Sequence, residues 1–196
     1  MDNENYLMNQ VGGSCKLINF NNGFIGKPRN LREAQIYQYQ LSKLHPFIPK
    51  FKEINDDYII LEDLTQNYEN PCILDLKMGT QTHADFASTS NIAKHQQRNQ
   101  YSTTSKLGIR ICGSLWHDPK TGHSIKKDKF YGRSLNIPDF IKELLSFFSD
   151  GSNLRIDVVS SLLRQLRNLQ STISQMDSFR FYGSSLLIIY EGGIHK

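Results

Sequence analysis

The chain has 196 residues, of which 38% are hydrophobic and 21% are charged, and its net charge at pH 7 is +4. This length permits one domain or two small lobes, and 11 Phe and 9 Tyr residues are enough to build a core, which excludes wholesale disorder. The longest apolar run, residues 186–190, is far shorter than the ~20 residues that cross a bilayer, so we expect no membrane span. The first ten residues lack a signal-peptide core and the three cysteines form no C-x-x-C pair, which favours the cytosol or nucleus.

The first elements along the chain are a hairpin, a helix and a strand. The hairpin covers residues 11–27 around an Asn-Asn-Gly turn at 21–23. Apolar residues at spacings of three and four predict a helix over 31–44, and residues 58–61 have strand character. Residues 62–70 are polar and turn-rich, and they indicate a connector between two lobes.

After the connector, strand and helix patterns are mixed. Strands are predicted at residues 73–76 and 107–115. Helices are predicted at 138–148 and 154–173, and one or two final strands at 179–190. The apolar stripe of 154–173 is expected in the core, whereas the polar residues 87–104 are expected to line a groove or form a surface loop. These patterns predict an α+β fold with two unequal lobes and a ligand-binding cleft between them.

Positive charge is concentrated in the middle third of the chain. Between residues 94 and 133 there are nine basic residues and two aspartates, which gives +7, so the rest of the chain must carry −3 of the total of +4. The concentration favours a local site for an anion, such as nucleic acid, a headgroup or a small polyphosphate. A solvated loop with scattered lysines is the alternative interpretation.

Residues 71–79 form the most specific stretch, P-x-x-x-D-x-K-x-G. Asp75 and Lys77 are two residues apart on a predicted strand, so their side chains project from the same face. They are interpreted either as a plain ion pair or as a site in which Lys77 neutralises a transferring phosphoryl group and Asp75 accepts a proton.

This stretch resembles the signature of the inositol polyphosphate kinase family, and three other segments support the resemblance. Residues 127–133, K-D-K-F-Y-G-R, and 181–192, which contain S-S-L-L, are similar to motifs of its inositol hexakisphosphate kinase branch. Gly26-Lys27-Pro28, followed by Arg32 and Glu33, resembles the K-P…R-E element of the nucleotide lobe. The four motifs occur in family order and cover about residues 11–192.

The resemblance implies a two-lobed, distantly protein-kinase-like fold with a nucleotide lobe at 1–61, a connector at 62–70 and a catalytic and substrate lobe at 71–196. It implies that Asp75 and Lys77 are catalytic, with Asp75 contacting either the ribose or the attacking hydroxyl, and that Glu33 orients Lys27. The ATP-binding residues that it implies are Lys27, Glu62, Asp63, Leu64, Asp75, Ser184 and Ser185. The substrate-binding residues that it implies are Lys77, Lys94, His95, Arg98, Lys126, Lys127, Lys129 and Arg133.

The implied activity is ATP- and Mg²⁺-dependent phosphorylation of soluble inositol polyphosphates by a monomer, with inositol hexakisphosphate as the expected substrate. A multikinase, a trisphosphate kinase and a non-enzymatic polyanion-binding module remain alternatives, whereas a nucleic-acid partner is not expected. A protein kinase is disfavoured because the sequence has no H-R-D or D-F-G element. The I-D-F segment, whose aspartate binds metal in the family, is also absent. No metal ligand is therefore assigned, and the chain is expected to lack a C-terminal part.

Overall fold

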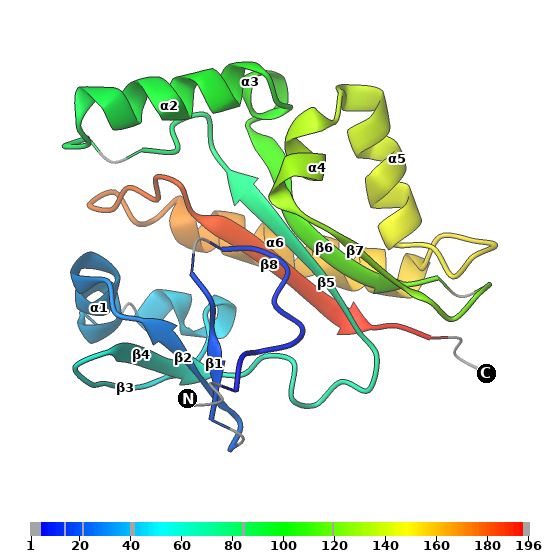
Figure 1. Ribbon diagram of the computed structural model, residues 1–196, viewed down its shortest axis with the longest axis horizontal. Helices are drawn as coiled ribbons and strands as arrows, with labels where there is room; N and C mark the ends of the chain where they lie inside the picture. Colours follow the sequence, from blue (N-terminus) through cyan, green and yellow to red (C-terminus); the bar gives the residue numbers. More distant parts are fainter. Residues whose placement is uncertain are drawn as a thin grey trace.

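Two antiparallel sheets joined by an extended connector form the framework of the molecule (Figure 1). The structure is a computed structural model that describes residues 5–13, 15–20, 22–39, 42–83, 85–118 and 120–193. The strand order is β1-β2-β4-β3 in the first sheet and β7-β6-β5-β8 in the second. The α+β fold class is confirmed, while the lobe boundaries that we expect stay a prediction.

The first sheet carries a small core of its own. Its strands are β1 (Ile18–Asn19), β2 (Phe24–Pro28), β3 (Phe51–Ile54) and β4 (Tyr58–Glu62). β1 and β2 form the predicted hairpin, although Asn21 of its turn lies outside the described residues. Ile25, Ile59 and Leu61 pack against Ala34 of helix α1 (Leu31–Gln38).

The helix predicted over residues 31–44 begins where expected but ends early. Asn30 fixes the start, because its Oδ1 accepts hydrogen bonds from two backbone N–H groups of the first turn. α1 ends before the predicted range is complete, and the chain then forms a 3₁₀ helix, η1 (Ser42–Phe47). Leu44 packs against Met176 from the far end of the chain and not with the core beside α1. The predicted C-terminal end of the helix is therefore wrong, because the segment that contains Leu44 packs against a residue distant in the sequence.

The second sheet is covered by helices on one face. Its strands are β5 (Pro71–Met78), β6 (Ile109–His117), β7 (Ser124–Lys127) and β8 (Ser185–Glu191), and the covering helices are α4 (Lys129–Ser134), α5 (Ile137–Phe147) and α6 (Ile156–Ile173). Leu74 and Ile111 from the strands meet Phe147 from α5 in the main core. Because side chains alternate along a strand, Asp75 and Lys77 project from the opposite face, which α4, α5 and α6 leave uncovered.

Residues 87–104, expected in a groove or a loop, are largely helical. They form α2 (Thr89–Gln100) and the start of α3 (Thr104–Leu107), with Ser88 accepting a hydrogen bond at the N-terminus of α2. The buried residue of α2 is Asn99, a polar side chain, so the helix has no apolar stripe that would reveal it in the sequence. In Figure 1, α2 and α3 lie near the end of β5.

The apolar stripe of α6 is less buried than predicted. Ile156 and Leu163 are exposed, whereas Val159 and Leu162 pack against the main core. β8 is the edge strand of its sheet, so α6 covers a margin of the sheet and not its centre. A cavity of about 580 Å³ lies between α6, β8 and Leu64 of the connector. None of the helices in the described part of the chain is long and apolar enough to span a membrane.

We expect Gly132→Ala to destabilise the fold, although alanine normally favours a helix. A Cβ at Gly132 would lie 2.1 Å from the carbonyl oxygen of Ile111, so α4 would have to move away from β6. Overpacking of this kind costs about 1–3 kcal/mol in the free energy of unfolding, which urea denaturation measures. Ser134→Ala, at an exposed position of α4, is the control and should change stability by less than about 0.5 kcal/mol. Equal stability of Gly132→Ala and the unmodified protein would contradict the close approach of α4 to β6.

Candidate active site

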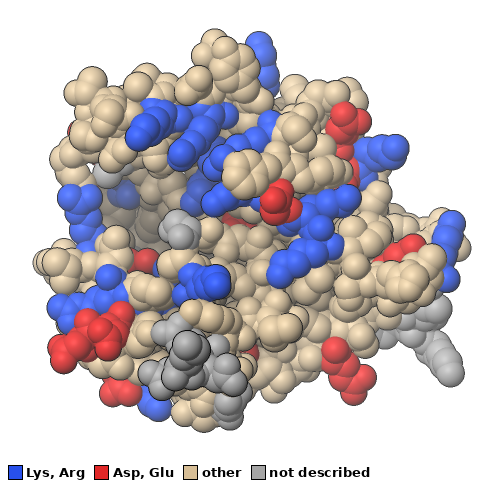
Figure 2. Space-filling model, viewed as in Figure 1, with Lys and Arg blue, Asp and Glu red and all other residues tan. Residues whose placement is uncertain are grey.

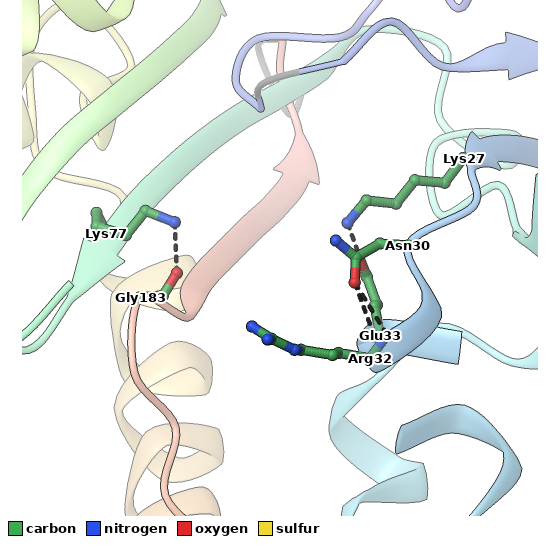
Figure 3. Close-up of polar contacts among 6 residues, drawn as sticks. All are labelled: Lys27, Asn30, Arg32, Glu33, Lys77 and Gly183. Carbon is green, nitrogen blue, oxygen red and sulfur yellow. Dashed lines mark hydrogen bonds and ion pairs between the residues drawn. The ribbon is translucent and has the colours of Figure 1, made fainter. Parts of the chain in front are cut away.

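Asp75 and Lys77 extend from the same face of β5, as predicted, but they do not form the simple ion pair. No ion pair joins them within the described residues; Lys77 Nζ instead donates a hydrogen bond to the carbonyl oxygen of Gly183 at 2.5 Å (Figure 3). Asp75 is 8% exposed, and its Oδ1 is buried with no hydrogen-bond partner. A buried carboxylate without full hydrogen bonding is uncommon in a purely structural role.

The pKa of Asp75 is raised because burial disfavours the charged carboxylate. A hydrogen bond with Ser185 and the positive charges of Lys77, Lys27 and Arg110 act in the opposite direction. Three cations from three strands therefore surround one carboxylate, which gives the uncovered face a positive potential. Such clustering of perturbed titratable groups is typical of functional sites.

The N-terminal segment packs directly over Asp75. A Cβ at Gly12 would lie 1.9 Å from Asp75 Oδ2, and a Cβ at Gly113 would lie 1.9 Å from the carbonyl oxygen of Val11. Two glycines far apart in sequence thus allow this segment to lie against the second sheet. A cavity of about 410 Å³ beside it is lined by Gly12, Gly13 and Lys129, among others. The sequence contained one signal for this contact, the Gly12-Gly13 pair.

Lys27 extends from the first sheet toward the same space. Its Nζ lies 2.6 Å from Glu33 Oε1 on α1, so the two residues form the contact that the resemblance implies. In Figure 3, Lys27 and Lys77 point toward one another from β2 and β5. The guanidinium of Arg32 stacks over the ring of Phe86 at 3.7 Å, which ties α1 to the segment after β5. Arg32 was not predicted as a contact residue.

The connector residues Glu62, Asp63 and Leu64 have different environments. The N–H of Glu62 donates to the Lys50 carbonyl and the N–H of Asp63 donates to the Gly23 carbonyl, so both are already occupied. Leu64 lines the cavity beside β8. A ligand at the connector would therefore meet the N–H of Leu64 or backbone carbonyls.

The two serines of the S-S-L-L motif face different ways. Ser184 Oγ donates to the Phe181 carbonyl in its own loop at 3.0 Å. Ser185 pairs opposite Lys77 on β5 and hydrogen-bonds with Asp75. The structure thus places the side chain of Ser185 in the site and turns that of Ser184 away.

The predicted basic residues form only part of a common surface. Figure 2 shows Lys and Arg side chains gathered beside the hollow between the two sheets. Burial lowers the pKa of Arg133, and the nearby charges of Arg98 and Arg110 lower it further, so these three guanidinium groups share one region. Burial also lowers the pKa of His95, with Arg98 contributing. Lys94 lies on α2 next to His95.

The remaining predicted lysines are divided between the faces of the second sheet. Lys126 pairs with Leu115, which shares the face of Asp75, whereas Lys127 pairs with Ser114 on the helix-covered face. Lys127 lies over the ring of Tyr131 at 4.5 Å. Lys129 lies over the ring of Phe130 and also lines the cavity beside Gly12. The structure therefore does not bring Lys127 to the surface that carries Lys77.

Arg110 is one of three basic residues between 94 and 133, with Lys106 and Lys120, for which the sequence predicts no role. It pairs directly opposite Lys77, because a register shift in the β5–β6 ladder between Asp75 and Leu76 brings it there. Strand periodicity alone does not reveal such a shift. Among the described residues, no group of three or more His, Cys, Asp or Glu side chains could hold a metal ion.

Comparisons with known proteins agree with this arrangement. The family model of inositol polyphosphate kinase matches residues 58–196. Human inositol hexakisphosphate kinase 3 is 40% identical over 158 residues, which are 81% of this chain and 38% of the relative. Mouse inositol hexakisphosphate kinase 2 is 41% identical over 135 residues, which are 69% of this chain and 30% of the relative. The chain therefore spans 30–38% of the length of these relatives.

Solved structures show the same fold. The inositol phosphate multikinase of S. cerevisiae, in complex with ADP and Mn²⁺, aligns with a TM-score of 0.74 and 23% identity over 86% of this chain and 75% of that one. A second inositol phosphate multikinase structure aligns with a TM-score of 0.74 and 25% identity over 82% of this chain and 80% of that one. The family model covers more than half of the sequence, and the Asp75–Lys77 strand lies within it. The chain thus belongs to the inositol polyphosphate kinase family.

Proposed function

We propose that this chain carries the nucleotide and substrate sites of an ATP-dependent inositol hexakisphosphate kinase, which forms an inositol pyrophosphate. The observation that carries this proposal is the position of Asp75 and Lys77 on the uncovered face of β5, with Lys27 pointing toward them from the first sheet. The names of the relatives favour inositol hexakisphosphate among the substrates of the family.

ATP would bind between the two sheets, with residues 1–61 acting as the nucleotide lobe. Lys27, held by Glu33, would contact its phosphates. Adenine would enter the cavity between Leu64 and Leu187, which is 48% exposed on β8. A largely apolar cavity with a few polar groups at its edge is the usual setting for a ligand of this kind.

The inositol polyphosphate would bind against α2 and α4. Its phosphates carry several negative charges, and Lys94, Arg98 and Arg133 offer the cations that such a ligand requires. An oxygen of the substrate would attack the γ-phosphorus of ATP in line, the bond to the β–γ bridging oxygen would break, and ADP would leave. Lys77 would neutralise the charge on the transferred group, and Asp75 would either bind the ribose or accept the proton of an attacking phosphate that is still protonated.

Mg²⁺, when bound with ATP, would neutralise its phosphate oxygens. The site offers one buried carboxylate, Asp75, with an Oδ1 that has no partner. Mg²⁺ commonly binds one or two carboxylates and completes its shell with phosphates and water, so this donor set fits the ion.

The proposal is tested by incubating the protein with Mg²⁺, ATP labelled at the γ-phosphate and a panel of inositol phosphates. Transfer to inositol hexakisphosphate, with a product more acidic than the substrate, is the expected result. Transfer only to inositol trisphosphates or tetrakisphosphates would replace it with the trisphosphate kinase or multikinase alternative. Binding without transfer would favour the polyanion-binding module.

We expect Lys27→Met to weaken ATP use specifically. It removes the cation at the phosphates and leaves Glu33 without its partner, so KM for ATP should rise about tenfold or more, because hydrogen bonds to charged groups contribute about 1.5–3 kcal/mol. KM for inositol hexakisphosphate should stay within about twofold. Lys43→Met, on an exposed residue of η1, removes the same charge from the same half and should change neither constant. A parallel rise of both Michaelis constants would contradict the nucleotide role of Lys27.

A further inference from the structure

Arg110 is a buried cation without a directly bonded counter-ion among the described residues, although its charge acts on Asp75 from a distance. It is 5% exposed and forms no ion pair with any described carboxylate. Its Nη1 donates to Asn99 Oδ1 at 3.0 Å and to Thr104 Oγ1 at 2.9 Å, and its Nε has no partner. Replacing a buried charge by packed apolar groups is often neutral or stabilising. Fold stability alone therefore does not account for an arginine at this position.

The hydrogen bonds of Arg110 continue into a buried polar cluster under α2. Asn99 Nδ2 donates to the Thr80 carbonyl at 2.8 Å and to Thr82 Oγ1 at 3.2 Å. Thr82 Oγ1 is also 2.8 Å from His95 Nδ1. His95 and Asn99 are four residues apart, so they lie on the same side of the helix. That side faces the sheet and the segment that follows β5.

This cluster determines which way the basic side of α2 points. Asn99 is the buried residue of the helix, and no apolar side chain of α2 is buried to fix its rotation. Lys94 and Arg98 each precede a member of the cluster by one residue, which rotates them by about 100° around the helix axis. Loss of the contacts below α2 would therefore redirect both cations.

Arg110 connects this cluster to the strand of the transfer site. It is paired directly opposite Lys77, and directly opposed like charges are normally unfavourable. The arrangement is understandable if both cations serve an anionic ligand. We propose that Arg110 is a positioning residue for substrate binding: through Asn99 and Thr104 it holds α2 so that Lys94 and Arg98 face the polyphosphate beside Lys77. This inference rests on the function proposed above.

The test is the affinity of the whole protein for inositol hexakisphosphate and, separately, for ATP, measured by isothermal titration calorimetry. Arg110→Lys keeps the charge but places a compact ammonium on a shorter side chain, which should not reach both acceptors that Nη1 contacts. We expect its Kd for inositol hexakisphosphate to rise at least tenfold and its Kd for ATP to stay within twofold. Thr104→Val removes one acceptor and should weaken binding of the polyphosphate by about threefold. Arg164→Lys, at an exposed position of α6, is the matched control and should change nothing.

Hydrogen exchange of the free proteins separates positioning from direct contact. In Arg110→Lys the amides of α2 should exchange at least tenfold faster, while those of β6 keep their protection. Unchanged exchange in α2, or an unchanged Kd for the polyphosphate, would overturn the inference about Arg110 and leave the proposed function intact. If the unmodified protein does not bind inositol hexakisphosphate, the proposed function fails, and the exchange of α2 still decides whether Arg110 holds the helix.

Discussion

Lys77→Ala should reduce phosphate transfer from ATP by about 10²–10³-fold with little change in the fold. The reduction is the cost of removing one group that stabilises charge in the transition state. Among the described residues, the side chain of Lys77 makes one hydrogen bond, to the Gly183 carbonyl, and it is only partly buried, so the melting temperature should fall by no more than a few degrees. Steady-state kinetics and thermal unfolding of the same preparation measure both quantities.

Two further variants sharpen this test. Lys77→Arg keeps the charge, but a planar guanidinium has a different reach and geometry from an ammonium group, so we expect partial activity. Lys106→Ala removes an exposed cation of α3 and should retain full activity. Transfer at the normal rate by Lys77→Ala would exclude Lys77 from the reaction, whatever its effect on stability.

The central strand and its polar face could be predicted from the sequence because strand geometry is local. A period of two places Asp75 and Lys77 on one side irrespective of what surrounds the strand. A period of two also locates β6, whereas a short run of residues with strand character locates β4. The contact between Lys27 and Glu33 followed from the resemblance, and it depends only on β2 and the first turn of α1.

The structural features that the sequence did not predict depend on contacts between segments that are distant in the chain. Arg110 reaches Lys77 through a register shift that no periodicity reveals. Leu44 leaves the predicted helix because it packs against Met176. The helical pattern of α2 is weak because its buried side chain is Asn99, a polar residue whose hydrogen-bond partners lie outside the helix.

The concentration of charge in the sequence located the basic region but did not identify which basic residues face the anion site. Lys126 and Lys127 are neighbours in the sequence, yet the alternation along β7 sends them to opposite faces. Only Lys126 shares the face of Asp75, while Lys127 stacks on Tyr131. A count of charges therefore predicts that an anion site exists, whereas the strand register decides which residues serve it.

Asp75→Asn should abolish most of the activity and, at neutral pH, stabilise the fold. A residue that accepts a proton contributes about 10²–10⁴-fold to a rate, and we expect kcat to fall by this amount. The pKa of Asp75 is raised in the folded protein by burial, so the charged carboxylate is less favourable there than in the unfolded chain. The amide removes this cost, and the free energy of unfolding should rise by about 0.5–2 kcal/mol, the usual range for a stabilising substitution.

The pH dependence of this increase in the free energy of unfolding tests whether desolvation of the Asp75 carboxylate causes it. In the window above the ordinary pKa of 3.8 and up to the raised folded value, the folded state binds more protons than the unfolded state, so the unmodified protein loses stability as pH rises. The advantage of Asp75→Asn should therefore be full above the folded pKa and vanish below the ordinary one. Asp63 is equally buried but accepts two hydrogen bonds from Thr65, so Asp63→Asn should give no such gain. Urea denaturation of both variants between about pH 3 and pH 8 measures the difference, and a gain for Asp75→Asn that is independent of pH would show that desolvation of its carboxylate is not the cause.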